Sequence, residues 1–203
     1  MAIRITHYNP SVPITTATSM ELEQNVKLGL PFDPGSHSDE PTLAMWRELE
    51  ERYGQVPALI QVIANSAELP RAWVGFVSAL RKEEGENTAR VQEIVILQVA
   101  MRTSNSYEFE HHKHRALDKE LLTTAEISHL GLGTGEDQWN EPERAALRLA
   151  DDIAEGRSIS QADLSVLVKE FSVASAVRLV VLASFYVAIG RIVKGLDLDL
   201  GDD

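Results

Sequence analysis

From Pro41 onward, apolar residues recur at helical spacing in almost every segment, and this periodicity is the strongest constraint on the fold. In the first such segment, TLAMWRELEERYG, one stripe holds Leu43, Trp46, Leu49 and Tyr53. Alternating apolar and polar runs bounded by hairpin turns are missing from the sequence, and so is a glycine-rich phosphate-binding loop. The sequence therefore predicts an all-α fold.

The first forty residues differ from the rest of the chain. The stretches NPSVPITTATS and LPFDPGSHSDEP are rich in Pro, Ser and Thr and show no sustained period. We predict an extended N-terminal arm over residues 1–40, with a short helical piece near MELEQNVKLG, and one compact multi-helix domain over residues 41–203. A chain of 203 residues with 44% hydrophobic residues is long enough to bury the core of such a domain.

The charge balance and the apolar runs bear on partners and location. The formal net charge of -12 argues against nucleic acid or an anionic membrane surface as a partner, because both attract clustered Lys and Arg. The longest apolar stretch holds twelve uncharged residues, Leu179 to Gly190, and a bilayer needs about 20. The N-terminus carries no apolar run of signal-peptide length. We expect a soluble, cytoplasmic protein with no nucleic-acid or membrane partner.

The final helix, expected over about residues 172–193, is apolar on nearly every side. Such a helix has to be covered all round. Neighbouring helices of one subunit would achieve this, but a subunit interface would achieve it more easily. We therefore expect a homo-oligomer.

Two neighbouring segments place an acid and an imidazole on inward faces. In VQEIVILQVAMRT, Glu93 shares its stripe with Ile96, Leu97 and Ala100. In SYEFEHHKHRAL, His112 shares a stripe with apolar neighbours and follows Glu108 by one turn. A buried carboxylate is costly unless another group pairs with it. We expect Glu93 and His112 to contact each other inside a dry cleft.

Structural interpretations of these residues remain open. Asn105 and Glu108 have capping-box spacing, which would make Glu108 a helix cap. His111 and His114 fall outside the inward stripe, which favours a solvated face. Glu93 and His112 would also satisfy each other as a buried pair without reactivity.

The stretch RVQEIVILQVAMRTSNSYEFEHHKHRAL resembles the signature of the carboxymuconolactone decarboxylase and alkylhydroperoxidase-D-like (AhpD-like) proteins. That signature is a helix beginning R-x-x-E-hydrophobic, a polar turn, and then Y-E-W-x-x-H-x-x-x-A. Phe109 stands in the place of the tryptophan. The matching residues are Arg90, Glu93, Tyr107, Glu108, His112 and Ala116. The resemblance extends over about residues 41–195.

The resemblance implies an all-α fold that assembles as trimers or hexamers, with the signature helices at a pocket near a subunit boundary. In the peroxidase branch of the family, two cysteines open the second helix, and they correspond here to Asn105 and Glu108. The relay acid and imidazole of that branch correspond to Glu93 and His112. Since the chain contains no cysteine at all, thiol-based peroxide reduction is excluded.

These residues favour a cofactor-independent lyase (a decarboxylase) or isomerase that acts by proton transfer on a small conjugated acid or lactone. The expected proton shuttle is His112, with Glu93 as its orienting partner and Glu108 as a second acid or base. Tyr107 is the expected hydrogen-bond donor to a developing oxyanion. Candidate substrate-binding residues are Asn105, Arg102 and Arg191, and Arg90 is a further candidate for holding a substrate carboxylate.

Two other classes of function remain open. Glu93, Glu108 and His112, with His111, form a carboxylate and imidazole set that suits Zn²⁺ or Fe²⁺, although no HExxH pair is present. The other class is a non-enzymatic, oligomeric ligand-binding protein in which the signature survives only as a buried polar pair.

Overall fold

A computed structural model describes residues 28–36, 40–66, 68–82, 88–132 and 138–198. Across these residues the chain is helical and contains no strand, which confirms the predicted all-α class. A 3₁₀ turn, η1, spans Pro34–Ser36. The α-helices are α1 (Glu40–Tyr53), α2 (Ala58–Ile63), α3 (Leu69–Leu80), α4 (Thr88–Arg102), α5 (Ser106–Asp118), α6 (Thr124–His129), α7 (Glu141–Ala154), α8 (Gln161–Glu170) and α9 (Val173–Gly195).

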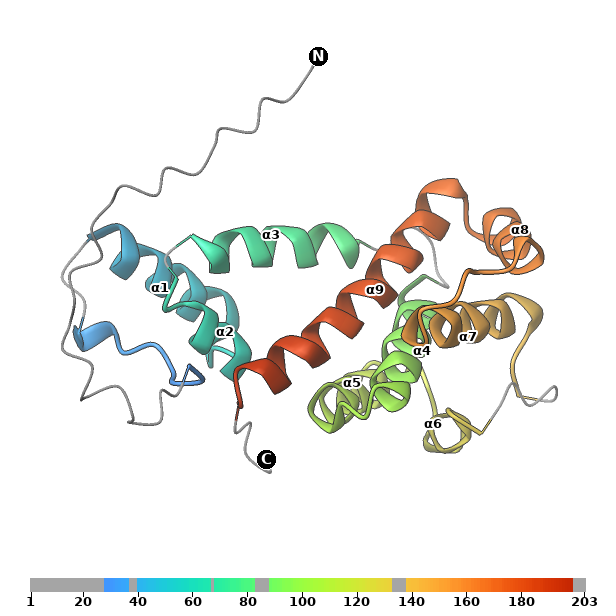
Figure 1. Ribbon diagram of the computed structural model, residues 1–203, viewed down its shortest axis with the longest axis horizontal. Coiled ribbons are helices and arrows are strands. Elements are labelled where there is room, and N and C mark those ends of the chain that lie inside the picture. The colour runs from blue at the N-terminus through green and yellow to red at the C-terminus, as the bar shows by residue number, and fades with distance from the viewer. Residues whose placement is uncertain (1–27, 37–39, 67, 83–87, 133–137, 199–203) are drawn as a thin grey trace, which may run out of the picture.

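Helix α4 lies at the centre of the fold and is buried on all sides from Val91 to Ala100. It packs against α5, α7 and α9 (Figure 1). Val95 and Val99 face a large core that α1, α2, α7 and α9 also build, whereas Ile94 and Leu97 face a smaller core beneath α5, α6 and α7. A polar side chain on α4 is therefore enclosed between two apolar cores.

Most of the predicted N-terminal arm lies outside the described residues, because residues 1–27 and 37–39 are not among them. The described part, residues 28–36, reaches the helical domain through Phe32. The Phe32 side chain is buried and its ring centroid lies 4.9 Å from that of Trp46. Its backbone N–H donates to the carbonyl of Gln61 at 2.9 Å.

The inward face of α1 differs from the predicted stripe. The buried residues are Thr42, Met45 and Leu49, while Tyr53 at the end of the helix is exposed. The face is rotated because Met45 rather than Leu43 meets the core, and the Tyr53 ring lies beside the Arg52 guanidinium at the surface.

Helix α9 runs diagonally across the domain, with α3 on one side and α4, α7 and α8 on the other (Figure 1). Among the described residues it is the one helix with the length and composition of a membrane-crossing helix, but it serves here as a core helix of the packed domain. Within the part of the chain that the structure describes, a stripe of valines on α9 is exposed, namely Val173, Val177 and Val181. Among the described helices, α4 is therefore enclosed on every side, whereas α9 has one exposed apolar face.

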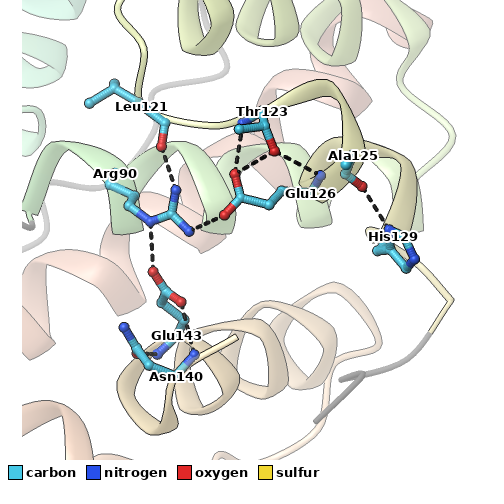
Figure 2. Close-up of polar contacts among 8 residues, drawn as sticks. All are labelled: Arg90, Leu121, Thr123, Ala125, Glu126, His129, Asn140 and Glu143. Carbon is cyan, nitrogen blue, oxygen red and sulfur yellow. Dashed lines mark hydrogen bonds and ion pairs between the residues drawn. The ribbon is translucent and has the colours of Figure 1, made fainter. Parts of the chain in front are cut away.

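In the sequence, Thr123 precedes Glu126 and Asn140 precedes Glu143 by three residues, which predicts a capping box at each, and both boxes are present. Glu126 completes the first and Glu143 the second. The carboxylates of both glutamates also accept hydrogen bonds from Arg90, at 2.6 and 2.7 Å, and the Arg90 guanidinium donates a third bond to the Leu121 carbonyl at 2.6 Å (Figure 2). One arginine in the first turn of α4 thus fastens the starts of α6 and α7.

Replacement of Arg90 by methionine is expected to lower the free energy of unfolding by about 2–3 kcal/mol, with allowance for the partial exposure of Arg90. Methionine keeps the aliphatic stem, so the loss reports the three hydrogen bonds. Urea denaturation measures the change. Arg47→Met is the matched control, because the Arg47–Glu40 pair on α1 is exposed. Equal effects of the two substitutions would contradict the fastening role of Arg90.

Candidate active site

A short turn between α4 and α5 sets the geometry of the site. It consists of Thr103, Ser104 and Asn105, and Ser104 takes the left-handed conformation with φ of 53°. The Asn105 backbone N–H donates back to the Ala100 carbonyl at 2.8 Å. The chain therefore reverses sharply, and the inward faces of α4 and α5 meet.

Glu93 of α4 and His112 of α5 make the contact that the sequence predicts. The Glu93 Oε2 atom lies 2.7 Å from His112 Nδ1. The Glu93 side chain is 0% exposed and that of His112 is 4% exposed, so the pair is fully enclosed.

Two residues that sequence reasoning missed complete the polar cluster. Tyr186 of α9 places its hydroxyl 2.9 Å from His112 Nε2. Arg81, directly after α3, donates one terminal amino group to Glu93 Oε1 and the other to the Tyr186 hydroxyl at 3.3 Å. Tyr186 and Ser184 are the two polar side chains in the apolar run Leu179–Gly190 of α9, and this was the available signal for Tyr186. Arg81 carried no such signal, because its place beyond α3 depends on the tertiary fold.

A third unpredicted residue, Arg115, approaches Glu93 from α5. Its Nε donates to Glu93 Oε1 at 2.8 Å. Burial on its own would raise the pKa of Glu93, but the hydrogen bonds and charges of His112 and Arg81 outweigh it and lower the pKa to about 2. Glu93 is therefore ionised and accepts hydrogen bonds, although burial alone would raise its pKa.

Glu108 and Asn105 form half of the expected capping box. The Asn105 side chain accepts from the Glu108 backbone N–H at 3.3 Å. The Glu108 carboxylate turns away from the cap instead, and its Oε2 lies 3.5 Å from His112 Nε2. Among the described residues the Asn105 Nδ2 atom finds no hydrogen-bond partner, and it packs against the backbone of α9 at Gly190.

The other predicted site residues lie farther out. Tyr107 is half-buried, and its ring is nearly parallel to that of His111 at a centroid distance of 6.2 Å. The exposed positions of His111 and His114 agree with a solvated face.

The predicted arginines lie outside the cluster around Glu93. Arg102 donates from Nε and Nη2 to both carboxylate oxygens of Asp151, at 2.7 and 2.9 Å. Arg191 is exposed on α9, and Arg90 is bound by the caps described above. The arginines next to the Glu93–His112 pair are Arg81 and Arg115.

The cluster fixes the protonation pattern of His112. Because Glu93 is ionised, His112 Nδ1 must carry a proton and donate it. Nε2 is then the atom that gains or loses a proton, between the Tyr186 hydroxyl and Glu108. Burial lowers the pKa of His112, but the hydrogen bonds with Glu108 and Glu93 raise it more, so the pKa lies above its ordinary value of 6.5. Burial raises the pKa of Tyr186, which keeps the hydroxyl protonated and able to donate.

This pattern predicts how stability depends on pH. A histidine whose pKa is higher in the folded state stabilises the fold fully below its unfolded pKa of about 6.5, and this contribution is lost as the pH rises through the folded pKa. The difference in unfolding free energy between the wild type and His112→Gln should therefore be largest below pH 6.5 and shrink at alkaline pH. Denaturation curves at several pH values measure it, and a difference that grew with pH would contradict the raised pKa.

The donor set of this cluster suits a proton relay better than a metal centre. Both oxygens of Glu93 are already bound by cationic or imidazole donors. In the part of the chain that the structure describes, no three His, Asp or Glu side chains are arranged to hold a metal ion.

Comparison with known proteins places the fold. No protein-family profile matches the sequence, and no curated protein matches it either. Among solved structures, the chain is similar to a cysteine-to-alanine variant of the debrominase Bmp8 in complex with 2,3,4-tribromopyrrole. The two are 18% identical, with a TM-score of 0.67 over 88% of this chain and 94% of the debrominase chain. The match shows the fold alone, which is a compact AhpD-like helical fold.

Proposed function

We propose that this chain is a cofactor-independent lyase or isomerase that transfers a proton on a small conjugated acid or lactone, with His112 as the proton shuttle. One observation carries the proposal: Glu93 holds Nδ1 of His112, while Nε2 faces a hydroxyl and a second carboxylate. An imidazole anchored at one nitrogen and exchangeable at the other is the arrangement that general acid–base catalysis requires.

In the isomerase reaction, neutral His112 takes a carbon-bound proton onto Nε2. The electron pair of the broken C–H bond enters the conjugated system and ends on a substrate oxygen. The imidazolium, flanked by Glu93 and Glu108, then returns the proton to another carbon. In a decarboxylation, the C–C bond electrons enter the same system as CO₂ leaves, and the protonated His112 supplies the proton that replaces the carboxyl group.

We assign the oxyanion-donor role to Tyr186 rather than to Tyr107. The Tyr186 hydroxyl lies 2.9 Å from Nε2, and Arg81 donates to its oxygen. When this hydroxyl turns its proton from Nε2 to a substrate oxygen, it stabilises the developing charge and frees Nε2 at the same time.

The structural neighbour supports the proposed size and conjugation of the substrate. The debrominase was crystallised with a tribrominated pyrrole, which is a small, flat, conjugated ring. This chain has no cysteine, so any chemistry here proceeds without a thiolate.

Solvent deuterium incorporation tests the proposal without knowledge of the full reaction. The wild type is incubated in D₂O with a panel of conjugated acids and lactones, and NMR records both deuterium at carbon and consumption of the substrate. The expected result is exchange or turnover that His112→Gln abolishes. Exchange that persists in His112→Gln would remove the imidazole from the mechanism.

A second candidate is a non-enzymatic ligand-binding protein, and the complete pairing of Glu93 favours it. A carboxylate with three donors and no exposed surface is also what a purely structural cluster contains. Under this candidate, wild type and His112→Gln would both bind a ligand from the panel without deuterium exchange.

We further propose that the protein is a cytoplasmic homo-oligomer, a trimer or hexamer. The uncovered valine stripe of α9 supports assembly, because an apolar helix face gains from burial against another subunit.

A further inference from the structure

Two arginines converge on one carboxylate in this site. Arg81 follows α3 and Arg115 lies on α5, and both donate to Oε1 of Glu93. A single carboxylate needs only one such partner to be neutralised. The second arginine therefore brings a positive charge beyond what Glu93 requires.

The two arginines differ in how much of each guanidinium is used. Arg81 employs both terminal amino groups, toward Glu93 and Tyr186. Among the described residues, Arg115 bonds only through Nε. The Arg115 side chain is 31% exposed, against 16% for Arg81 and 4% for His112. Arg115 thus presents two terminal amino groups at the outer edge of a buried relay.

The surface beside Arg115 suits a flat, conjugated body. Tyr107, His111 and Arg115 follow one another at four-residue spacing on α5, so they lie on one stripe. The rings of Tyr107 and His111 are 14° from parallel. A planar molecule can pack against this pair of rings while an anionic group reaches the guanidinium.

The site gathers basic residues locally within an acidic protein. The chain carries a formal net charge of -12, whereas the cluster brings together the basic residues Arg81, Arg115 and His112 against the acids Glu93 and Glu108. When His112 is protonated, the cluster has one uncompensated positive charge. An organic monoanion would neutralise it.

We propose that the terminal amino groups of Arg115 bind the carboxylate of a small, flat, conjugated monocarboxylic acid, whose body lies along Tyr107 and His111. This proposal names a substrate class for the proposed proton-transfer site. It rests on the proposed function only in the claim that the bound acid reacts. The binding itself requires no turnover.

Calorimetric titration with sorbate, a conjugated dienoic acid, and with its neutral amide tests the proposal. The wild type should bind sorbate more tightly than the amide. Arg115→Gln should weaken sorbate binding by about tenfold or more and leave amide binding unchanged. Arg115→Lys keeps the charge but loses the paired donors of the guanidinium, so its affinity for sorbate should lie between those of the wild type and Arg115→Gln. Lys113→Gln is the matched control, because Lys113 pairs with Glu110 at the surface, and it should bind like the wild type.

Three outcomes would overturn the proposal: a wild type without preference for sorbate over the amide, a wild type that binds neither, or an Arg115→Gln variant that loses both ligands equally. Circular dichroism and the melting temperature show whether the Arg115 variants are folded. If Arg115→Gln is unfolded, the test uses Arg115→Lys in its place. His112→Gln separates this proposal from the proposed function. It should still bind sorbate more tightly than the amide, because Arg115 is intact, although the loss of the imidazolium charge weakens sorbate binding, while deuterium exchange is abolished.

Discussion

Replacement of Glu93 by glutamine is expected to lower the free energy of unfolding by about 3–5 kcal/mol, because it leaves buried cationic groups without their anion. Arg81, Arg115 and His112 all donate to this one carboxylate, whose side chain is 0% exposed. For a chain of this size, such a loss corresponds to a fall in melting temperature of roughly 10 °C. Differential scanning calorimetry at neutral pH measures it.

Glu110→Gln is the matched control for this prediction. Glu110 lies on the exposed face of α5 and pairs with Lys113, so its replacement should change the stability by less than about 1 kcal/mol. If Glu93→Gln were no more destabilising than Glu110→Gln, the buried ion cluster would not hold α3, α4 and α5 together. The lowered pKa of Glu93 also predicts acid sensitivity, since its contribution to stability is present above pH 4.5 and is lost as the pH falls toward 2.

Replacement of His112 by glutamine is expected to reduce kcat on an identified substrate by about 10²–10⁴-fold, the range in which a positioned acid or base contributes. Glutamine can still donate a hydrogen bond to Glu93 but cannot exchange a proton at neutral pH. The site should therefore bind substrate and fail in the chemical step. Steady-state kinetics with separate kcat and KM values measure this split.

His114→Gln is the control for the kinetic experiment, because His114 is exposed on the same helix. It should leave kcat unchanged. A His112→Gln enzyme with a wild-type kcat would show that the imidazole is only a structural partner of Glu93.

The sequence was informative wherever local spacing decides the structure. The capping boxes at Thr123 and Asn140 formed as predicted, since each depends on residues three positions apart. The contact of Glu93 with His112 followed from two inward stripes joined by a short turn. In both cases the partners are close in the sequence, so helical periodicity brings them together, with the help of one short turn for Glu93 and His112.

The remaining members of the site depend on long-range packing. Arg81 and Tyr186 contact each other across 105 positions of sequence, and periodicity shows which face a residue occupies but not which helix lies opposite. Arg90 and Arg102 lie away from the Glu93–His112 pair and bind the carboxylates of other helices, which periodicity does not show either. Arg115 follows His112 by three residues, so both lie on the same side of α5. This spacing was a usable signal for Arg115 in the sequence.

The most direct test of the relay is the protonation of the two ring nitrogens of His112. Two-dimensional ¹H–¹⁵N NMR of histidine-labelled protein, with His112→Gln for assignment, follows both atoms through a pH titration. Nδ1 should remain protonated throughout because Glu93 holds its proton, while Nε2 should titrate with a pKa above 6.5. A neutral ring that carried its proton on Nε2, or a pKa below 6.5, would contradict the proposed shuttle.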